Sequence, residues 1–154
     1  MNIFVLDENP WIAARMLCDK HVVKMILESA QMLCTAHWAS GGRADYKPTH
    51  INHPCSVWVR RSLSNYRWLF LHAMELCREY TRRYSRIHKT QDIIEWCGKN
   101  LPNIKNVGLL EFVQAMPDEY KCDSAVEAYR KYYLGEKIVF AKWKLGRIPH
   151  FVLQ

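Results

Sequence analysis

One stretch of the sequence carries side chains whose types could do acid–base chemistry. In residues 19–31, DKHVVKMILESAQ, the residues His21, Lys24, Glu28 and Gln31 recur at i, i+3, i+7 and i+10. This spacing places a histidine, an amine, a carboxylate and an amide on one side of an α-helix. In a cleft of reduced dielectric these groups would change each other's proton affinity and form a general acid–base cluster. The same residue types also occur on any solvated helix, and the spacing alone favours that simpler interpretation.

The helix that would carry these side chains is predicted over residues 19–37. Asp19 is expected to cap its start, and the side opposite the polar residues is apolar, with Val22, Val23, Ile26, Ala30 and Leu33. Before it, Asn9 followed by Pro10 is typical of a helix start and predicts a short helix over residues 10–17.

The rest of the chain predicts further helices joined by irregular segments. Residues 39–54 hold two glycines and two prolines and predict a long loop, and Pro54 can open the next helix. Apolar residues then follow in steps of three and four to Tyr84, which predicts one long, unbroken helix. Short helices are expected over residues 91–100, with Thr90 as cap, and over residues 124–134, where Ser124 and Glu127 form a capping box. We therefore expect an all-α, single domain over residues 1–154, built around one long central helix with shorter helices and long irregular loops.

The charge of the chain favours a polyanionic partner. The 22 lysines and arginines exceed the 15 acidic residues and give a formal net charge of +7, which suits nucleic acid. On the predicted long helix one lateral face carries Arg60, Arg67, Arg78 and Arg82, and such a stripe could follow a phosphate backbone. Solvated arginines that keep a long helix soluble explain the same stripe equally well. We also expect Gln31 and the loop residues Arg43, Lys47 and His53 to contact duplex DNA.

Several other classes of protein lack support in the sequence. His50 and His53 have metal-ligand spacing, but they lie in a loop without a nearby carboxylate or cysteine, so we expect no metal. The six cysteines form no close pair, which favours reduced thiols. No P-loop, dinucleotide fingerprint or zinc-hydrolase motif occurs, so no cofactor is expected. Without a signal peptide or a long apolar stretch, the sequence predicts a soluble, monomeric, cytoplasmic protein, in the host cell if it is viral.

The chain resembles the small all-helical pyrimidine-dimer DNA glycosylases with AP-lyase activity of phages, algal viruses and some bacteria. Their first long helix carries a histidine seven residues before a catalytic glutamate, a pair that matches His21 and Glu28. Pro48, Thr49 and His53 are similar to the segment before the family's next long helix. The stretches MPDEYK and YLGEK in the last third are also similar to family segments. This resemblance implies that Glu28 is catalytic and that His21 orients it or the sugar.

Two departures from the family concern how the substrate is held and attacked. The family has arginines immediately before and three residues after its glutamate, where this chain has Leu27 and Gln31. Family members attack the sugar carbon with an α-amine exposed when methionine is removed, and Asn2 should leave Met1 in place. Either the Met1 amine serves, or Lys24 supplies the amine, or the lyase step is missing.

The sequence therefore predicts a DNA glycosylase, with or without AP-lyase activity, that excises a damaged or modified pyrimidine from duplex DNA. Two alternatives stay open. One is a non-catalytic viral protein that binds nucleic acid or inhibits a partner, and the other is a small enzyme that uses His21 and Glu28 on free nucleotides.

Overall fold

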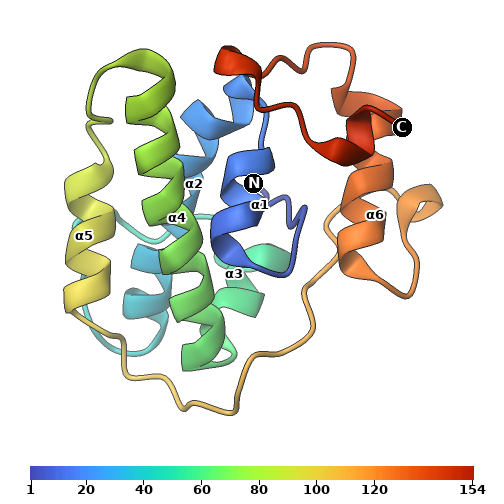
Figure 1. Cartoon of the computed structure of the whole chain (residues 1–154). Helices are drawn as coiled ribbons and strands as arrows, with labels where there is room; N and C mark the ends of the chain where they lie inside the picture. The colour runs from blue at the N-terminus through green and yellow to red at the C-terminus, as the bar shows by residue number, and fades with distance from the viewer.

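The structure is a computed structural model that describes the backbone of residues 1–154 and the burial of every residue except Gly146. It is all-helical, as predicted, and no strand occurs in the described chain. The six α-helices are α1 (Pro10–Met16), α2 (Asp19–Ala39), α3 (Pro54–Arg60), α4 (Leu63–Tyr84), α5 (Gln91–Lys99) and α6 (Ala125–Tyr132). Helices α1, α2, α4 and α5 form one bundle, and α6 lies apart from it beyond the N-terminal segment (Figure 1).

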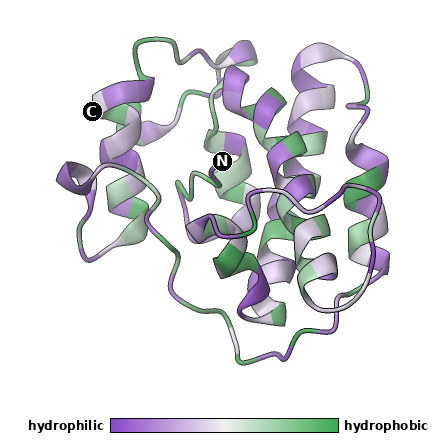
Figure 2. Ribbon diagram, turned by 180° about the vertical axis from the view of Figure 1, so that it is seen from behind, coloured by the Kyte–Doolittle hydropathy of each residue, from purple (hydrophilic) through white to green (hydrophobic). Residues whose placement is uncertain are grey.

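The two long helices α2 and α4 pack against each other at the centre of the bundle. Helices α1, α3 and α5 also contact α4. The shared core is filled by fully buried side chains of both long helices, among them Val22, Ile26, Leu33, Leu69, Ala73 and Leu76. Apolar and polar residues alternate along the helices, as expected when each helix buries one side (Figure 2). Helix α4 is thus the long central helix that the apolar spacing predicts.

The predicted long helix is, however, interrupted at residues 61–62, and its first part is the separate helix α3. Ser62 is extended, with φ −157° and ψ 143°. Its hydroxyl donates to the carbonyl of Gly108 at 2.7 Å and accepts from the backbone N–H of Val107 at 3.1 Å. The prediction of an unbroken helix was wrong because these contacts come from a segment more than forty residues away. The apolar spacing continues through the break and gives no sign of these contacts.

The residues predicted to cap the helices occupy the cap position, except at α2. The Asn9 side chain accepts from the N–H groups of Trp11 and Ile12, and the Ser124 hydroxyl accepts from that of Glu127. Thr90 precedes α5 but makes no side-chain cap bond. The prediction for Asp19 was wrong, because Cys18 occupies the cap position and Asp19 is the first helical residue. The Asp19 carboxylate instead accepts hydrogen bonds from other parts of the chain.

A buried arginine, Arg83, joins three helix ends. Its side chain is fully enclosed and lies 3.0 Å from a carboxylate oxygen of Glu79 and 3.0 Å from one of Asp19. The same guanidinium donates to the carbonyls of Leu17 and Arg15 at 2.9 and 3.2 Å. These bonds hold the end of α1, the start of α2 and the end of α4 together, and thereby fix where α2 begins.

The last third of the chain returns to the N-terminus. The irregular segment after α5 runs along one end of the bundle to α6 (Figure 1). A π-helical turn, Tyr133–Lys137, follows α6 directly. It contains Gly135, where an added Cβ would lie 2.6 Å from the Tyr120 ring. The remaining turns are the 3-10 turns Asp118–Tyr120, Lys144–Gly146 and His150–Val152. No helix of the described chain is long and apolar enough to cross a membrane.

Candidate active site

Glu28 is a buried carboxylate that faces the start of the chain. It is 7% exposed, and its Oε1 atom accepts a hydrogen bond from the backbone N–H of Asn2 at 3.0 Å. The α-amine of Met1 lies 3.4 Å from the same oxygen. Lys24, one turn earlier on α2, lies 3.8 Å from Oε2, and its side chain is 70% exposed. The carboxylate therefore has one backbone nitrogen and two amines around it.

Asn2 fixes the first residues of the chain beside Glu28. Its side-chain oxygen accepts from the N–H groups of Ile3 and Phe4 at 2.8 and 3.2 Å. Its side-chain amide donates to the carbonyl of Ala115 at 2.8 Å. The amide thus ties the N-terminus to the irregular segment before α6, and both nitrogens next to Glu28 are held in place by these bonds.

His21 is also buried and lies on α2, seven residues before Glu28. It is 6% exposed, and its ring stacks on Phe4 with centroids 4.1 Å apart. Phe4 has φ +58°, a left-handed conformation that is strained for a bulky residue. The backbone bond to Asn2 and the stack on His21 hold this conformation. The burial of His21 and Glu28 decides against a solvated helix face.

The environment of His21 keeps its ring neutral. Burial lowers its pKa to about 3, and the positive charges of Lys137, Lys24 and Lys20 act in the same direction. Nδ1 of the ring is hydrogen-bonded to the hydroxyl of Tyr133. His21 is therefore an uncharged hydrogen-bonding group at neutral pH. It is not an imidazolium and cannot act as a general acid in that form.

These groups line one small pocket of about 180 Å³. Its walls come from both ends of the chain: Met1, Asn2, Phe4, His21, Lys24, Met25, Glu28, Tyr132 and Lys137. The Lys137 ammonium lies over the ring of Tyr132, 4.8 Å from its centroid. Lys20, which is exposed, lies over Phe140 at 4.8 Å. One buried carboxylate in a pocket lined by Lys24 and Lys137, with Lys20 nearby, suits a site that receives a phosphate-bearing substrate.

The predicted arginine stripe does not come to this pocket. Arg60 belongs to α3, and one nitrogen of its guanidinium is buried without a partner. Arg67 lies on α4 beside α5, exposed. Arg78 bonds Glu75 at 3.1 Å, and Arg82 bonds Glu79 at 2.6 Å. The four arginines thus lie on two helices, and none of them lines the pocket.

The other residues expected to contact DNA do not line the pocket either. His53 caps α3 by accepting from the N–H of Cys55, and burial together with the nearby N-terminal charge lowers its pKa. Gln31 is half-buried, Arg43 is exposed, and the Lys47 ammonium lies over the Trp38 ring at 5.0 Å. In the described chain no three His, Cys, Asp or Glu side chains gather in a way that could hold a metal ion.

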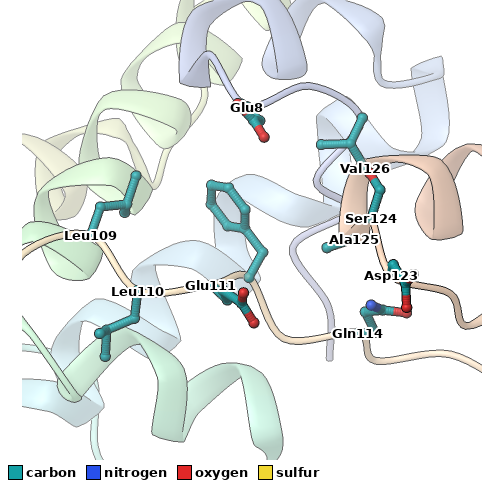
Figure 3. Close-up of a pocket in the computed structure, with 10 residues that line it drawn as sticks. Glu8, Leu109, Leu110, Glu111, Gln114, Asp123, Ser124, Ala125 and Val126 are labelled. Atoms are coloured by element: carbon teal, nitrogen blue, oxygen red, sulfur yellow. The ribbon is translucent and has the colours of Figure 1, made fainter.

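A larger pocket, about 370 Å³, lies between the segment before α6, the start of α6 and the loop before α1. Figure 3 shows Glu8, Glu111 and Asp123 among the residues that line it. Three carboxylates would repel a phosphate backbone, and no buried base or amine lies among them. We therefore place the candidate active site at Glu28 rather than at this larger hollow.

Sequence reasoning missed five residues of the site: Asn2, Phe4, Tyr132, Tyr133 and Lys137. The stretch YLGEK, which contains Tyr133 and Lys137, resembles a family segment, but nothing in its spacing connects it with α2. Asn2 was considered only for its effect on methionine removal. Contacts such as that between Tyr133 and His21 span 112 positions, and only the folded chain brings them together.

The buried histidines predict a loss of stability in mild acid. His72 is enclosed, and burial lowers its pKa to about 4, as burial lowers that of His21 to about 3. Below about pH 6.5 the unfolded chain binds protons that the folded chain rejects, so stability is complete above that pH and falls as pH falls. We expect roughly 2 kcal/mol per ring to be lost between pH 7 and pH 5.

Urea unfolding at several pH values measures this loss. The variant His21→Gln should lose the share of His21, roughly 2 kcal/mol, and keep the rest, which belongs to His72 and to His37, His53 and His88, whose pKa values burial also lowers. A free energy of unfolding that is the same at pH 7 and pH 5 would show that these rings are charged in the folded protein.

Comparisons with known proteins identify one family for the chain. No curated protein and no solved structure matches the chain. The model of one protein family, described as pyrimidine dimer DNA glycosylase, matches residues 1–92, more than half of the chain. The match contains His21, Lys24 and Glu28 but ends before Tyr133 and Lys137. The chain therefore belongs to the pyrimidine dimer DNA glycosylase family.

Proposed function

We propose that this protein is a DNA glycosylase with AP-lyase activity that removes a damaged pyrimidine from duplex DNA. Its family acts at DNA, and the finer activity rests on one observation. The buried carboxylate of Glu28 holds nitrogen atoms of the chain's first two residues at 3.0 and 3.4 Å. An amine beside a buried carboxylate can attack a sugar carbon and pass its protons to that carboxylate.

The terminal α-amine suits the role of nucleophile better than Lys24. The Met1 nitrogen lies closer to Glu28 than the Lys24 ammonium does, 3.4 Å against 3.8 Å, and Lys24 is mostly exposed. Removal of Met1 would turn the Asn2 nitrogen, 3.0 Å from Glu28, into the α-amine. Either form of the chain thus presents an amine to the same carboxylate, and the departure at Asn2 does not remove the nucleophile.

In this proposal the amine lone pair forms a bond to C1′ of the damaged nucleotide while the bond from C1′ to the base breaks. The base leaves with the bonding electrons and takes up a proton. Glu28 stabilises the positive charge that develops on the sugar, and then accepts the proton that the attacking amine loses. Glu28 passes that proton to the ring oxygen as the sugar ring opens and gives an imine. It then takes a proton from C2′ while the 3′ phosphate leaves with the bonding electrons, which completes the lyase step.

A duplex with a single cyclobutane pyrimidine dimer tests the proposal. We expect the protein to break the bond from C1′ to one base of the dimer, which stays joined to its neighbour through the cyclobutane ring, and to nick that strand. It should leave an undamaged duplex of the same sequence intact. Binding to both duplexes without any base release would favour a non-catalytic DNA-binding protein. Turnover of free nucleotides alone would favour a nucleotide enzyme.

The lysines around the pocket are expected to grip the substrate phosphates. Changing Lys20 and Lys137 together to Gln should weaken binding to all duplex sequences. It should also lower the slope of log affinity against log salt by roughly two units, because each lost phosphate contact removes about one. Titrations of labelled duplex at several salt concentrations measure this slope.

The matched control changes Arg67 and Arg78 together to Gln, which removes the same charge from the exposed face of α4. The sequence predicted that these arginines hold the DNA backbone, and the control tests that prediction. We expect the slope of the arginine variant to stay near that of the wild type. A larger change in the arginine variant than in the lysine variant would move the DNA interface to α4.

A further inference from the structure

Tyr133 is a fully buried side chain that contacts His21 from the other end of the chain. It is the first residue of the π-helical turn after α6 and is 0% exposed. Its hydroxyl lies among three groups: the backbone N–H of Cys18 at 3.2 Å, the Cys18 sulfur at 3.5 Å, and Nδ1 of His21. The hydrogen bonds that this hydroxyl makes decide which nitrogen of His21 carries the proton.

The direction of each bond follows from what the groups can donate. The Cys18 N–H can only donate, so it takes one lone pair of the Tyr133 oxygen. The hydroxyl proton is then free for either the ring nitrogen or the sulfur. Sulfur is the weaker acceptor and lies 3.5 Å away, so the proton goes to Nδ1 of His21. Burial raises the pKa of Tyr133 well above its ordinary value, which keeps the hydroxyl protonated.

The second ring nitrogen of His21 is left for the substrate. A neutral imidazole that accepts at Nδ1 carries its proton on Nε2. Nε2 has no hydrogen-bond partner in the described chain. It is not fully enclosed either, because it does not belong to the buried polar atoms without a partner. It therefore opens toward the pocket that His21 shares with Glu28. The stack on Phe4 and the edge contacts of Phe140 and Tyr133 keep the ring in this orientation.

We propose that Tyr133 is a positioning residue that holds His21 as the neutral Nε2–H tautomer, so that the site offers the substrate a hydrogen-bond donor and not a general base beside Glu28. The proposal rests on the proposed function for its substrate, an oxygen of the sugar or phosphate of the damaged nucleotide. The state of the ring itself is a property of the free protein. A wrong tautomer in a correctly folded site is known to lower turnover strongly in other enzymes.

The tautomer is measured directly by long-range 1H–15N NMR of protein with 15N-labelled histidine. The resonances of His21 are identified by their loss in His21→Gln. We expect the wild type to show a protonated Nε2 and an unprotonated Nδ1 that stay unchanged from pH 8 to pH 5. A proton on Nδ1, or a charged ring in this range, would overturn the proposal even if the protein cleaves dimer-containing DNA.

The variant Tyr133→Phe removes only the hydroxyl. We expect the His21 resonances to report a mixture of the two tautomers and the rate of base release to fall about 10-fold or more at saturating duplex, while duplex affinity stays near that of the wild type. Unchanged His21 resonances in this variant would contradict the proposal. The measurement on the wild type decides the question if the variant does not fold.

Tyr129→Phe is the matched control, because Tyr129 lies one turn earlier and is also 0% exposed. Its hydroxyl bonds backbone groups of the segment before α6, at Val113 and Ala115, and also the Cys55 thiol, and it makes no hydrogen bond to His21. Both variants lose one buried hydroxyl and should lose a similar stability. Only Tyr133→Phe should change the His21 resonances. The same change in both variants would mean that general loosening of α6, and not Tyr133, affects the ring.

Discussion

Glu28→Gln should lower the rate of base release at least ~100-fold, which is the scale of losing one electrostatic or acid–base contribution in an active site. Glutamine keeps the size of the side chain and can still accept from the N–H of Asn2 with its amide oxygen. It cannot carry the negative charge that balances the developing charge on the sugar. It also cannot take the proton of an amine 3.4 Å away. Single-turnover cleavage of dimer-containing duplex measures the rate.

Folding and duplex binding should survive this substitution. Glu28→Gln removes one carboxylate from a cationic pocket, so duplex affinity is expected to hold or to rise slightly. Glu127→Gln, which changes an exposed carboxylate on α6, is the control and should leave the rate unchanged. A Glu28→Gln variant that cleaves as fast as the wild type would remove Glu28 from the chemistry.

Arg83→Met should lower the free energy of unfolding by about 3–5 kcal/mol, the range found when one partner of a buried ion pair is removed. Methionine fills much of the same space but leaves the enclosed Glu79 carboxylate, 2% exposed, with only the partly exposed Arg82 and Arg147 as ionic partners, and leaves Asp19 without Arg83. It also leaves the carbonyls of Leu17 and Arg15 without a donor from this side chain. Urea unfolding followed by circular dichroism measures the change.

Arg78→Met provides the comparison on the same helix. The Arg78 side chain is 68% exposed and pairs with Glu75 at 3.1 Å, and such an exposed pair contributes about 0–1 kcal/mol. If Arg83→Met costs no more than Arg78→Met, then the contacts of Arg83 do not hold the ends of α1, α2 and α4 together.

Local signals in the sequence were enough to predict the helices and the part of the site that lies on α2. The Asn9–Pro10 pair, the Ser124 cap and the apolar side of α2 depend on neighbouring residues alone. The structure has both caps as predicted and buries the expected apolar residues of α2 except Val23, which is 40% exposed. His21 and Glu28 lie seven residues apart on α2, and this spacing brings them to the same small pocket. Whether their face is buried or solvated depends on what covers it, and spacing gave no information on that.

The features that sequence reasoning missed all depend on contacts between distant segments. Ser62 breaks the predicted long helix because residues 106–108 offer its hydroxyl better partners. The Asp19 carboxylate bonds Arg83 and the N–H of Lys144 instead of capping α2. Lys137 joins Lys24 at the pocket because the π-helical turn after α6 brings it there. None of these pairings leaves a periodic signal in the sequence.

The most direct test of the proposed chemistry is to trap the imine with borohydride on dimer-containing duplex and to map the attached residue. Trypsin separates the candidates, because residues 1–15 form one peptide, whereas a modified Lys24, which trypsin does not cut, lies in the peptide of residues 21–43. We predict that the sugar remnant is found on the α-amine of the first peptide. The mass of that peptide also shows whether Met1 is retained. We further predict that Lys24→Ala still gives the adduct. An adduct on Lys24, or strand cleavage with no adduct at all, would contradict the account of a terminal amine held by Glu28.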